Sequence, residues 1–229
     1  MRSGHAVMAA APVLAAGIGV RRGRGWAVRT ASFRISAPTP GGSALGILID
    51  RPSEAAALID LLAGVARPAY GELRVLGHDM STIRGRAAVR RRVGVARRNA
   101  RPLPGMRIRG LVEHAARLAR PDRRDRHVLA AAILDRLALM PWAEVAVRSA
   151  PESVARRARL AAAAVHQPEL LLLDGLLDGL AERDAAGLAD AIRDLGRDSG
   201  VLVTGCDAAA LARACDEVML LSDGVLISR

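Results

Sequence analysis

The chain of 229 residues contains no lysine, because all 34 of its basic residues are arginines. This absence excludes any mechanism that needs a lysine ammonium group. Aromatic residues make up only 2% of the chain, so stacking platforms for single-stranded nucleic acid are scarce. The two cysteines, Cys206 and Cys215, form no CxxC pair and have no histidine cluster near them. We therefore expect two small core residues of a reduced cytoplasmic protein, with no disulfide and no metal site.

Long apolar runs are also missing, since a membrane-spanning helix needs about 20 strongly apolar residues. The uncharged run 6–20 is shorter than this and rich in alanine and glycine. An alternative interpretation is a signal peptide, because Arg2 precedes the run, although Pro12 and two glycines interrupt it. Half of the chain is hydrophobic, a quarter is charged, and the net charge is +11. This composition is typical of a soluble globular protein.

Short apolar strands and helical segments alternate from about residue 33 to the end, which is the pattern of a parallel α/β sheet. Ser53 is expected to cap the first helix, Gly64 to end it, and Asp178 and Asp207 to cap later helices. We expect strands at 44–49, 72–76, 92–96, 169–174 and 201–204, helices at 53–62, 154–165, 181–195 and 208–214, and a final hairpin at 217–227.

The stretch 107–148 differs from the rest, because alanine, leucine and arginine recur there in helical period without any strand-like run. We therefore expect a single domain over 1–229 with a helical subdomain inserted at about 98–167.

Several short motifs follow one another along the chain: LLAG at 61–64, RP at 67–68, GELRVLG at 71–77, PELLLLD at 168–174, VLVT at 201–204 and an Asp-Gly turn at 223–224. In their sequence and order these motifs resemble the ATP-binding domain of ABC transporters. The resemblance implies a P-loop NTPase-like α/β fold with a mostly parallel sheet, an antiparallel β part and an inserted helical subdomain. It also implies ATP and Mg²⁺ as the ligands of the family and a membrane-spanning permease as a partner.

The phosphate loop of this family, GxxxxGK[ST], aligns with residues 49–56. Ile49 and Glu54 replace the two glycines whose backbone amides wrap the phosphates, Ala55 replaces the lysine and Ala56 the Mg²⁺-binding hydroxyl. Asp50 adds a second carboxylate where phosphate oxygens would lie. The remnants of the nucleotide site are then Asp50, Arg51, Ser53, Glu54, Ala55, Ala56, Arg98 and Asp174.

The catalytic positions implied by the resemblance are altered as well. Asp174 survives as one acidic partner for Mg²⁺, should the metal be retained, but Gly175 stands at the glutamate that polarises water. Arg98 replaces a glutamine, Ala181 an aspartate and Cys206 the histidine that holds the γ-phosphate. A neutral thiol cannot supply the cation that an imidazolium provides.

Two further positions complete the comparison with the family. The glycine-rich signature LSGGQ aligns with Ala150, Pro151, Glu152, Ser153 and Val154, which contain no glycine. The aromatic residue that stacks on adenine aligns either with Arg22 or with Trp26.

The sequence therefore predicts a pseudo-ATPase without a cofactor, kept as a subunit of a transporter assembly. Its partner would be an active ATP-binding subunit or a permease, the latter facing the surface of residues 98–142. We expect a cytoplasmic location, peripheral at the inner face of the membrane. One alternative is a compensated ATPase in which Arg51 or Arg98 replaces the lysine. Another is an arginine-rich nucleic-acid-binding protein, based on the basic stretches 90–101 and 120–126.

Overall fold

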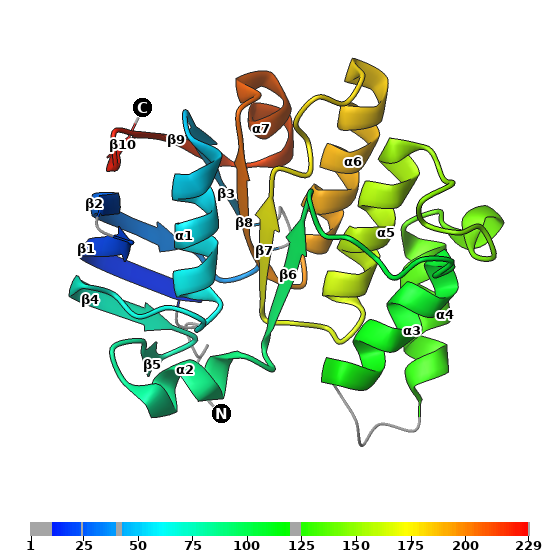
Figure 1. Ribbon diagram of the computed structural model, residues 1–229, viewed down its shortest axis with the longest axis horizontal. Coiled ribbons are helices and arrows are strands. Elements are labelled where there is room, and N and C mark those ends of the chain that lie inside the picture. Colours follow the sequence, from blue (N-terminus) through cyan, green and yellow to red (C-terminus); the bar gives the residue numbers. More distant parts are fainter. Residues whose placement is uncertain (1–10, 24, 40–42, 120–124, 229) are drawn as a thin grey trace, which may run out of the picture.

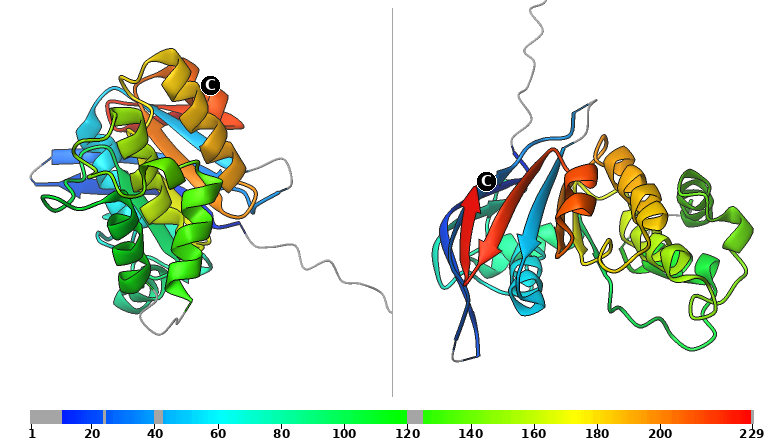
Figure 2. Two further views of the ribbon diagram at one scale, coloured as in Figure 1. Left: turned by 90° about the vertical axis from the view of Figure 1, so that its right-hand side faces the viewer. Right: turned by 90° about the horizontal axis from the view of Figure 1, so that it is seen from above.

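The computed structural model describes residues 11–23, 25–39, 43–119 and 125–228, and we refer to these as the described residues. Within them a single sheet runs through the molecule in the order β5-β4-β1-β2-β10-β9-β3-β8-β7-β6. Helices cover it, and those of the segment around 108–164 gather at the end of the molecule opposite the antiparallel strands (Figure 1, Figure 2). The predicted α/β fold, mostly parallel with an antiparallel part and added helices, is confirmed.

The parallel half of the sheet positions the candidate site. Its strands β3, β6, β7 and β8 pair side by side in parallel, and β9 pairs in parallel with the other edge of β3. Every residue of β8 and nearly every residue of β7 is buried, as expected for strands covered on both faces. The bounds are Ala44–Ile49 for β3, Val93–Arg97 for β6, Leu170–Asp174 for β7, Gly200–Gly205 for β8 and Glu217–Ser222 for β9.

The antiparallel half consists of β1 (Val13–Arg22), β2 (Gly25–Ile35), β4 (Tyr70–Val75) and β5 (His78–Asp79). It joins the parallel half through β10 (Val225–Ser228), which forms the predicted hairpin with β9 and pairs in parallel with β2. A signal peptide is the alternative interpretation that the sequence offers for the uncharged run 6–20. From Val13 onward it is a strand of the sheet, and residues 1–10 lie outside the described part.

Seven α-helices and one 3₁₀ turn are present in the described residues. In Figure 1, α1 lies in the angle between the antiparallel strands and the parallel strands, whereas α3, α4, α5 and α6 lie on the other side. No helix of the described residues is long and apolar enough to span a bilayer. The bounds are Pro52–Leu62 for α1, Ile83–Val89 for α2, Ile108–Ala119 for α3, Arg126–Arg136 for α4, Met140–Trp142 for the 3₁₀ turn, Glu152–Ala164 for α5, Glu182–Leu195 for α6 and Ala208–Ala214 for α7.

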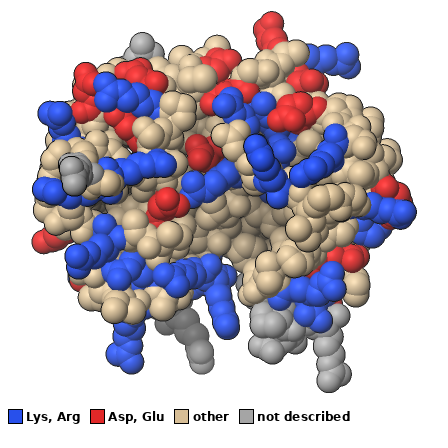
Figure 3. All heavy atoms as spheres, in the orientation of Figure 1, with Lys and Arg blue, Asp and Glu red and all other residues tan. Residues whose placement is uncertain are grey.

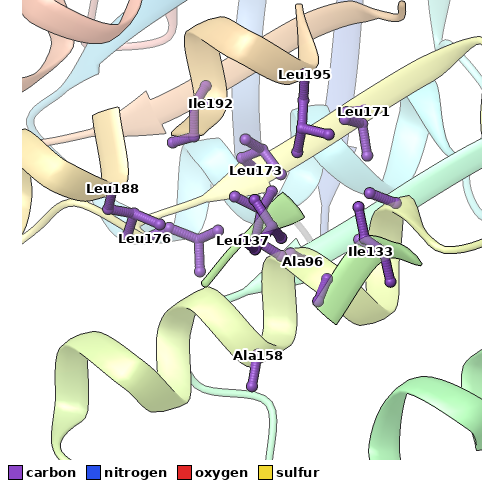
Figure 4. Packing of buried hydrophobic residues seen from close by; sticks show 14 of the residues in the cluster. Ala96, Ile133, Leu137, Ala158, Leu171, Leu173, Leu176, Leu188, Ile192 and Leu195 are labelled. Atoms are coloured by element: carbon purple, nitrogen blue, oxygen red, sulfur yellow. The ribbon is translucent and has the colours of Figure 1, made fainter. Parts of the chain in front are cut away.

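The hydrophobic core has two parts, one on each face of the parallel strands. One cluster joins α1 to the antiparallel strands. The other joins β6 and β7 to α4, α5 and α6, and Figure 4 shows Leu171 and Leu173 in one cluster with Leu188, Ile192 and Leu195. Because both faces of these strands are filled, the strand ends are held rigidly at one edge of the sheet.

Most element predictions are confirmed to within a few residues, including the end of α1 at Gly64, which has φ +73°. Asp207 caps α7 as predicted, since its Oδ1 accepts from the amides of residues 209 and 210. The prediction for Ser53 is wrong, because Pro52 occupies the first helical position and Arg51 precedes it as an N-cap without a side-chain hydrogen bond. The boundaries of the helical subdomain, 98–167, stay a prediction.

Candidate functional site

A cavity of about 480 Å³ opens at the carboxyl ends of β3, β6, β7 and β8. Ligands of open α/β sheets bind at this edge of the strands. The cavity collects many of the residues that the sequence assigned to a nucleotide site, although they are far apart in the chain. Its lining includes Ile49, Asp50, Pro52, Ala56, Arg97, Arg98, Asn99, Asp174, Gly175, Asp178 and Cys206.

The loop that leads from β3 into α1 is bound to the turn between β9 and β10. Asp50 accepts a hydrogen bond from the Ser222 hydroxyl at 2.6 Å, and the Arg51 guanidinium lies 2.6 Å from the Asp223 carboxylate. Both contacts join residues 172 positions apart in the chain. The charged groups of this loop therefore interact with protein and do not converge on a common anion position.

Glu54, in the first turn of α1, is the most unusual group in the loop. Its side chain is only 4% exposed, it accepts from the Gly224 amide, and Arg51 is 3.7 Å from its Oε1. Its Oε2 has no hydrogen-bond partner. Burial raises the pKa of Glu54 above its usual value, and the nearby Arg51 opposes this shift only in part.

The two positions that the sequence aligns with the family's lysine and hydroxyl hold alanines, whose methyl groups offer no hydrogen bond or charge. Ala55 is fully buried in the core beneath the loop, and Ala56 presents a methyl group to the cavity. Arg22, rather than Trp26, reaches the loop, since its Nη1 donates to the Ser53 carbonyl at 3.0 Å. Trp26 instead packs edge-on against Tyr70, with ring centroids 5.3 Å apart.

Asp174 lies at the end of β7 and is held by its neighbours in the sheet. The Thr204 hydroxyl donates to its Oδ1 at 3.2 Å, and Arg97 approaches its Oδ2 at 3.8 Å. Arg97 also forms a 2.5 Å ion pair with Asp60 of α1. Burial raises the pKa of Asp174, while Thr204 and Arg97 act in the opposite direction. The surviving carboxylate is therefore engaged by a hydroxyl and a guanidinium.

Gly175, at the position of the lost general base, has φ +64°, a conformation that side chains of L-residues rarely adopt. Its amide donates to the Thr204 carbonyl at 2.9 Å, and a Cβ would lie 3.2 Å from Asp178 Oδ2. Arg98 packs beside it, with Cβ 3.6 Å from the same point. In the described residues, no hydrogen bond or ion pair of the Arg98 guanidinium is found. Arg98 thus lines the cavity, and no described residue pairs with its guanidinium.

Cys206 follows β8, and the expectation that it lies in the core is wrong because the residue is exposed, whereas Cys215 is buried as expected. The Cys206 amide donates to Asp178 Oδ1 at 2.8 Å. The sequence predicts Asp178 as a helix cap, but its carboxylate instead accepts this hydrogen bond from the Cys206 amide. Burial and the Asp178 carboxylate raise the pKa of the Cys206 thiol. The thiol is therefore neutral near pH 7, where the family has a histidine.

Residues 150–154, aligned with the family signature, form the start of α5. Pro151 stands at the N-cap without a side-chain hydrogen bond, and Glu152 lies 2.7 Å from Arg156 and 3.6 Å from Arg159. Burial alone would raise the pKa of Glu152, but the two arginines have the larger combined effect, so the pKa is lowered. Ala150 and Val154 pack against the core. The start of α5 is thus an ion-paired helix end in place of an anion-binding one.

Arg156, which the sequence did not single out, connects this helix to the turn after β7. It is 6% exposed, and its Nη1 donates to the carbonyls of Leu176 and Asp178 at 3.1 and 2.5 Å. Ala181, which the sequence aligns with an aspartate of the family, is the N-cap of α6 and makes no side-chain cap hydrogen bond. A buried arginine with carbonyl partners is not recognisable in an arginine-rich sequence, because the pattern gives no sign of which arginines are buried.

Comparison with solved structures identifies the fold. A nucleotide-free ATP-binding cassette from an ABC transporter matches with a TM-score of 0.79 and 14% identity, covering 95% of this chain and 90% of the other. CbiO1 from Clostridium perfringens, part of the cbiONQ ABC transporter complex, matches with a TM-score of 0.77, 14% identity and coverages of 95% and 87%. At such identities these matches define the fold, which is that of an ATP-binding cassette.

Sequence comparison then identifies the family. The family model described as ABC transporter matches residues 56–177, and the chain belongs to this family as an ATP-binding domain. The Daunorubicin resistance ATP-binding protein DrrA3 of Streptomyces coeruleorubidus is 31% identical over 164 residues, 71% of this chain and 51% of that protein. The Methionine import ATP-binding protein MetN 2 of Burkholderia mallei is 24% identical over 190 residues, 81% and 48%. The chain spans about half the length of these relatives.

Proposed function

We propose that this chain is a non-catalytic subunit of an ABC transporter, an ATP-binding-type domain that neither binds ATP tightly nor hydrolyses it. The observation that carries the proposal is the loop 49–56, in which a buried carboxylate and an arginine tied to Asp223 stand where the family holds phosphate. Transition-state contacts of this kind contribute about 3–4 kcal/mol each to phosphoryl transfer, and several are replaced together.

The residues of the cavity do not suit Mg²⁺-bound ATP. Glu54 lies at the N-terminal end of α1, where it would repel an incoming phosphate, and the neighbouring Asp50 adds a second negative charge. Asp174 is approached by Arg97, a cation that competes with a metal ion for the same carboxylate. A hydroxyl to complete a metal site with Asp174 is missing at Ala56. These features support loss of the ligand rather than a change in its binding mode.

The proposed role follows from an intact framework around an altered site. The parallel sheet, α1 and the helices of the 108–164 region keep the fold of an ATP-binding cassette. Such a domain can pair with an active ATP-binding subunit or dock on a permease through the surface of residues 98–142. Because Glu152 and its ion pairs replace the signature, the chain would not complete the nucleotide site of a partner.

The test is hydrolysis of Mg²⁺-ATP by the purified chain, with an intact ATP-binding cassette as positive control. The proposal predicts phosphate release at background level, unchanged by Asp174→Asn. Turnover above background that Asp174→Asn abolishes would refute it.

A compensated ATPase is the second candidate, and one observation favours it. Arg98 lines the cavity without an ion pair to a described residue, whereas Arg51, the other arginine considered as a lysine substitute, is bound to Asp223. A guanidinium is larger and flatter than an ammonium group and does not reproduce its point charge. This candidate predicts ATP binding that Arg98→Ala removes, and it fails if the two proteins bind ATP equally weakly.

A further inference from the structure

Five arginines at and beside α2 have no carboxylate partner among the described residues. Many arginines elsewhere in the described residues form ion pairs, such as Arg92, which holds both carboxylate oxygens of Glu169 at 2.6 and 2.7 Å. No ion pair to a described residue is found for the α2 group. Figure 3 shows arginines gathered along the lower left of the molecule, where Figure 1 places β5 and α2. The members are Arg67, Arg84, Arg86, Arg90 and Arg91.

Two of these arginines are fixed in place without being neutralised. Arg86 donates to the carbonyls of Met80 and Ser81 at 3.0 and 2.8 Å, and Arg90 donates to the Gly64 carbonyl at 3.0 and 3.2 Å. A carbonyl orients a guanidinium but leaves its full positive charge. The acidic residue nearest in sequence, Asp79, accepts from the Ser81 amide. Arg86 and Arg90 therefore hold positive charges at fixed positions, and the exposed Arg67, Arg84 and Arg91 add further charges that no described carboxylate pairs with.

Exposed aliphatic side chains lie among these charges. Ile83, at the start of α2, is 80% exposed and is the most exposed large hydrophobic residue of the described part. Val65 is 67% exposed. The backbone of its neighbour Gly64 packs directly on α2, since a Cβ at Gly64 would lie 2.7 Å from the Arg86 carbonyl oxygen. We call these two residues and the five arginines the α2 surface.

We propose that the α2 surface binds the headgroup region of an anionic phospholipid bilayer. Arginines pair with lipid phosphates, and aliphatic side chains between them enter the boundary with the acyl chains. Nucleic acid could also pair with the arginines, but it offers no apolar environment for an exposed isoleucine and valine. The α2 surface also has no aromatic side chain to stack on bases. This inference does not rest on the proposed function, because it needs neither ATP nor a permease.

The test is co-sedimentation of the purified chain with vesicles of phosphatidylcholine alone or with added phosphatidylglycerol, at about 0.1 M salt. Each arginine near an anionic surface increases partitioning about fivefold, so Arg84→Glu/Arg91→Glu should lower the partition coefficient at least about 25-fold. Ile83→Ser should lower it about tenfold. The matched control is Arg148→Glu/Arg183→Glu, two exposed arginines elsewhere that also lack ion pairs to described residues.

The proposal predicts binding to anionic vesicles, weak binding to phosphatidylcholine, loss in the α2 variants and retention in the control. Circular dichroism of each variant establishes that it is folded. No binding of the wild-type chain to anionic vesicles would overturn the proposal, and so would equal loss in the control, which would indicate unspecific charge attraction. Tighter binding to duplex nucleic acid than to vesicles, weakened by Arg84→Glu/Arg91→Glu, would assign the surface to nucleic acid instead.

Discussion

Replacing the buried Glu54 by glutamine should stabilise the folded chain at neutral pH. The Glu54 side chain is 4% exposed, its Oε2 lacks a hydrogen-bond partner, and Arg51 at 3.7 Å is shared with Asp223. Glutamine keeps the shape and the acceptor for the Gly224 amide but removes the buried charge. Because burial disfavours the carboxylate more than Arg51 compensates, and glutamine avoids burying that charge, we expect Glu54→Gln to raise the free energy of unfolding by about 1 kcal/mol.

The effect of Glu54→Gln on stability should depend on pH. Burial holds the pKa of Glu54 in the folded state above its usual 4.5. At pH values between 4.5 and this raised pKa, the folded state therefore binds more protons than the unfolded state. The wild-type chain therefore loses stability as the pH rises through this window, and the full loss persists above the folded pKa. The advantage of Glu54→Gln should be small near pH 4 and largest near neutrality.

The measurement is urea unfolding of both proteins at a series of pH values. The control is Glu182→Gln, which changes an exposed glutamate in the first turn of α6 and should at most lower stability, by about 0.3–1 kcal/mol, through its lost interaction with the helix dipole. A Glu54→Gln protein that is less stable than wild type near neutrality would refute the reasoning, and so would an advantage of the same size at all pH values.

Three further predictions concern the turn after β7 and its contacts. Gly175→Glu, which restores the family's general base in sequence, should destabilise the chain by about 1–2 kcal/mol in urea unfolding because of its positive φ, and a gain of ATP turnover would contradict the account. Arg156→Met leaves two buried carbonyls without a donor and should cost about 3 kcal/mol by the same assay, so a neutral result would show that the contacts are dispensable. A thiol reagent should modify Cys206 in the folded chain, faster in Asp178→Asn because the aspartate raises the thiol pKa, whereas Cys215, with its pKa raised to about 12 by burial, should react only on unfolding. Equal rates for Cys206 in both proteins would refute this last prediction.

The elements that the sequence predicted well are those with an unbroken local pattern. Strand 169–174 contains the continuous apolar run 170–173, and helix 208–214 begins after a capping aspartate, so the local sequence alone predicts both elements. The strands β1 and β2 were not predicted, because their pairing contains register shifts near Gly17, which has φ +55°. Such bulges interrupt the alternation of buried and exposed residues by which a strand is recognised.

For the candidate site, the sequence predicted which residues come together but not the contacts that they make. Alignment with the family indicated which residues are missing from the loop 49–56, and the cavity does bring Asp50, Arg98, Asp174, Gly175 and Cys206 together. The contacts that these residues make could not be predicted. They join distant segments, as β3 and β9 do through their parallel pairing, and the partner of each arginine depends on that packing.

Equilibrium binding of ATP to the purified chain tests the central claim most directly. Titration calorimetry with Mg²⁺-ATP up to millimolar concentration, and with ATP in chelator, covers both metal-dependent and metal-free binding. The account predicts no saturable heat in either titration, because the loop that should hold the phosphates presents carboxylates and is fastened to its own hairpin. Saturable binding with a dissociation constant below about 1 mM, which corresponds to about −4 kcal/mol, would contradict it.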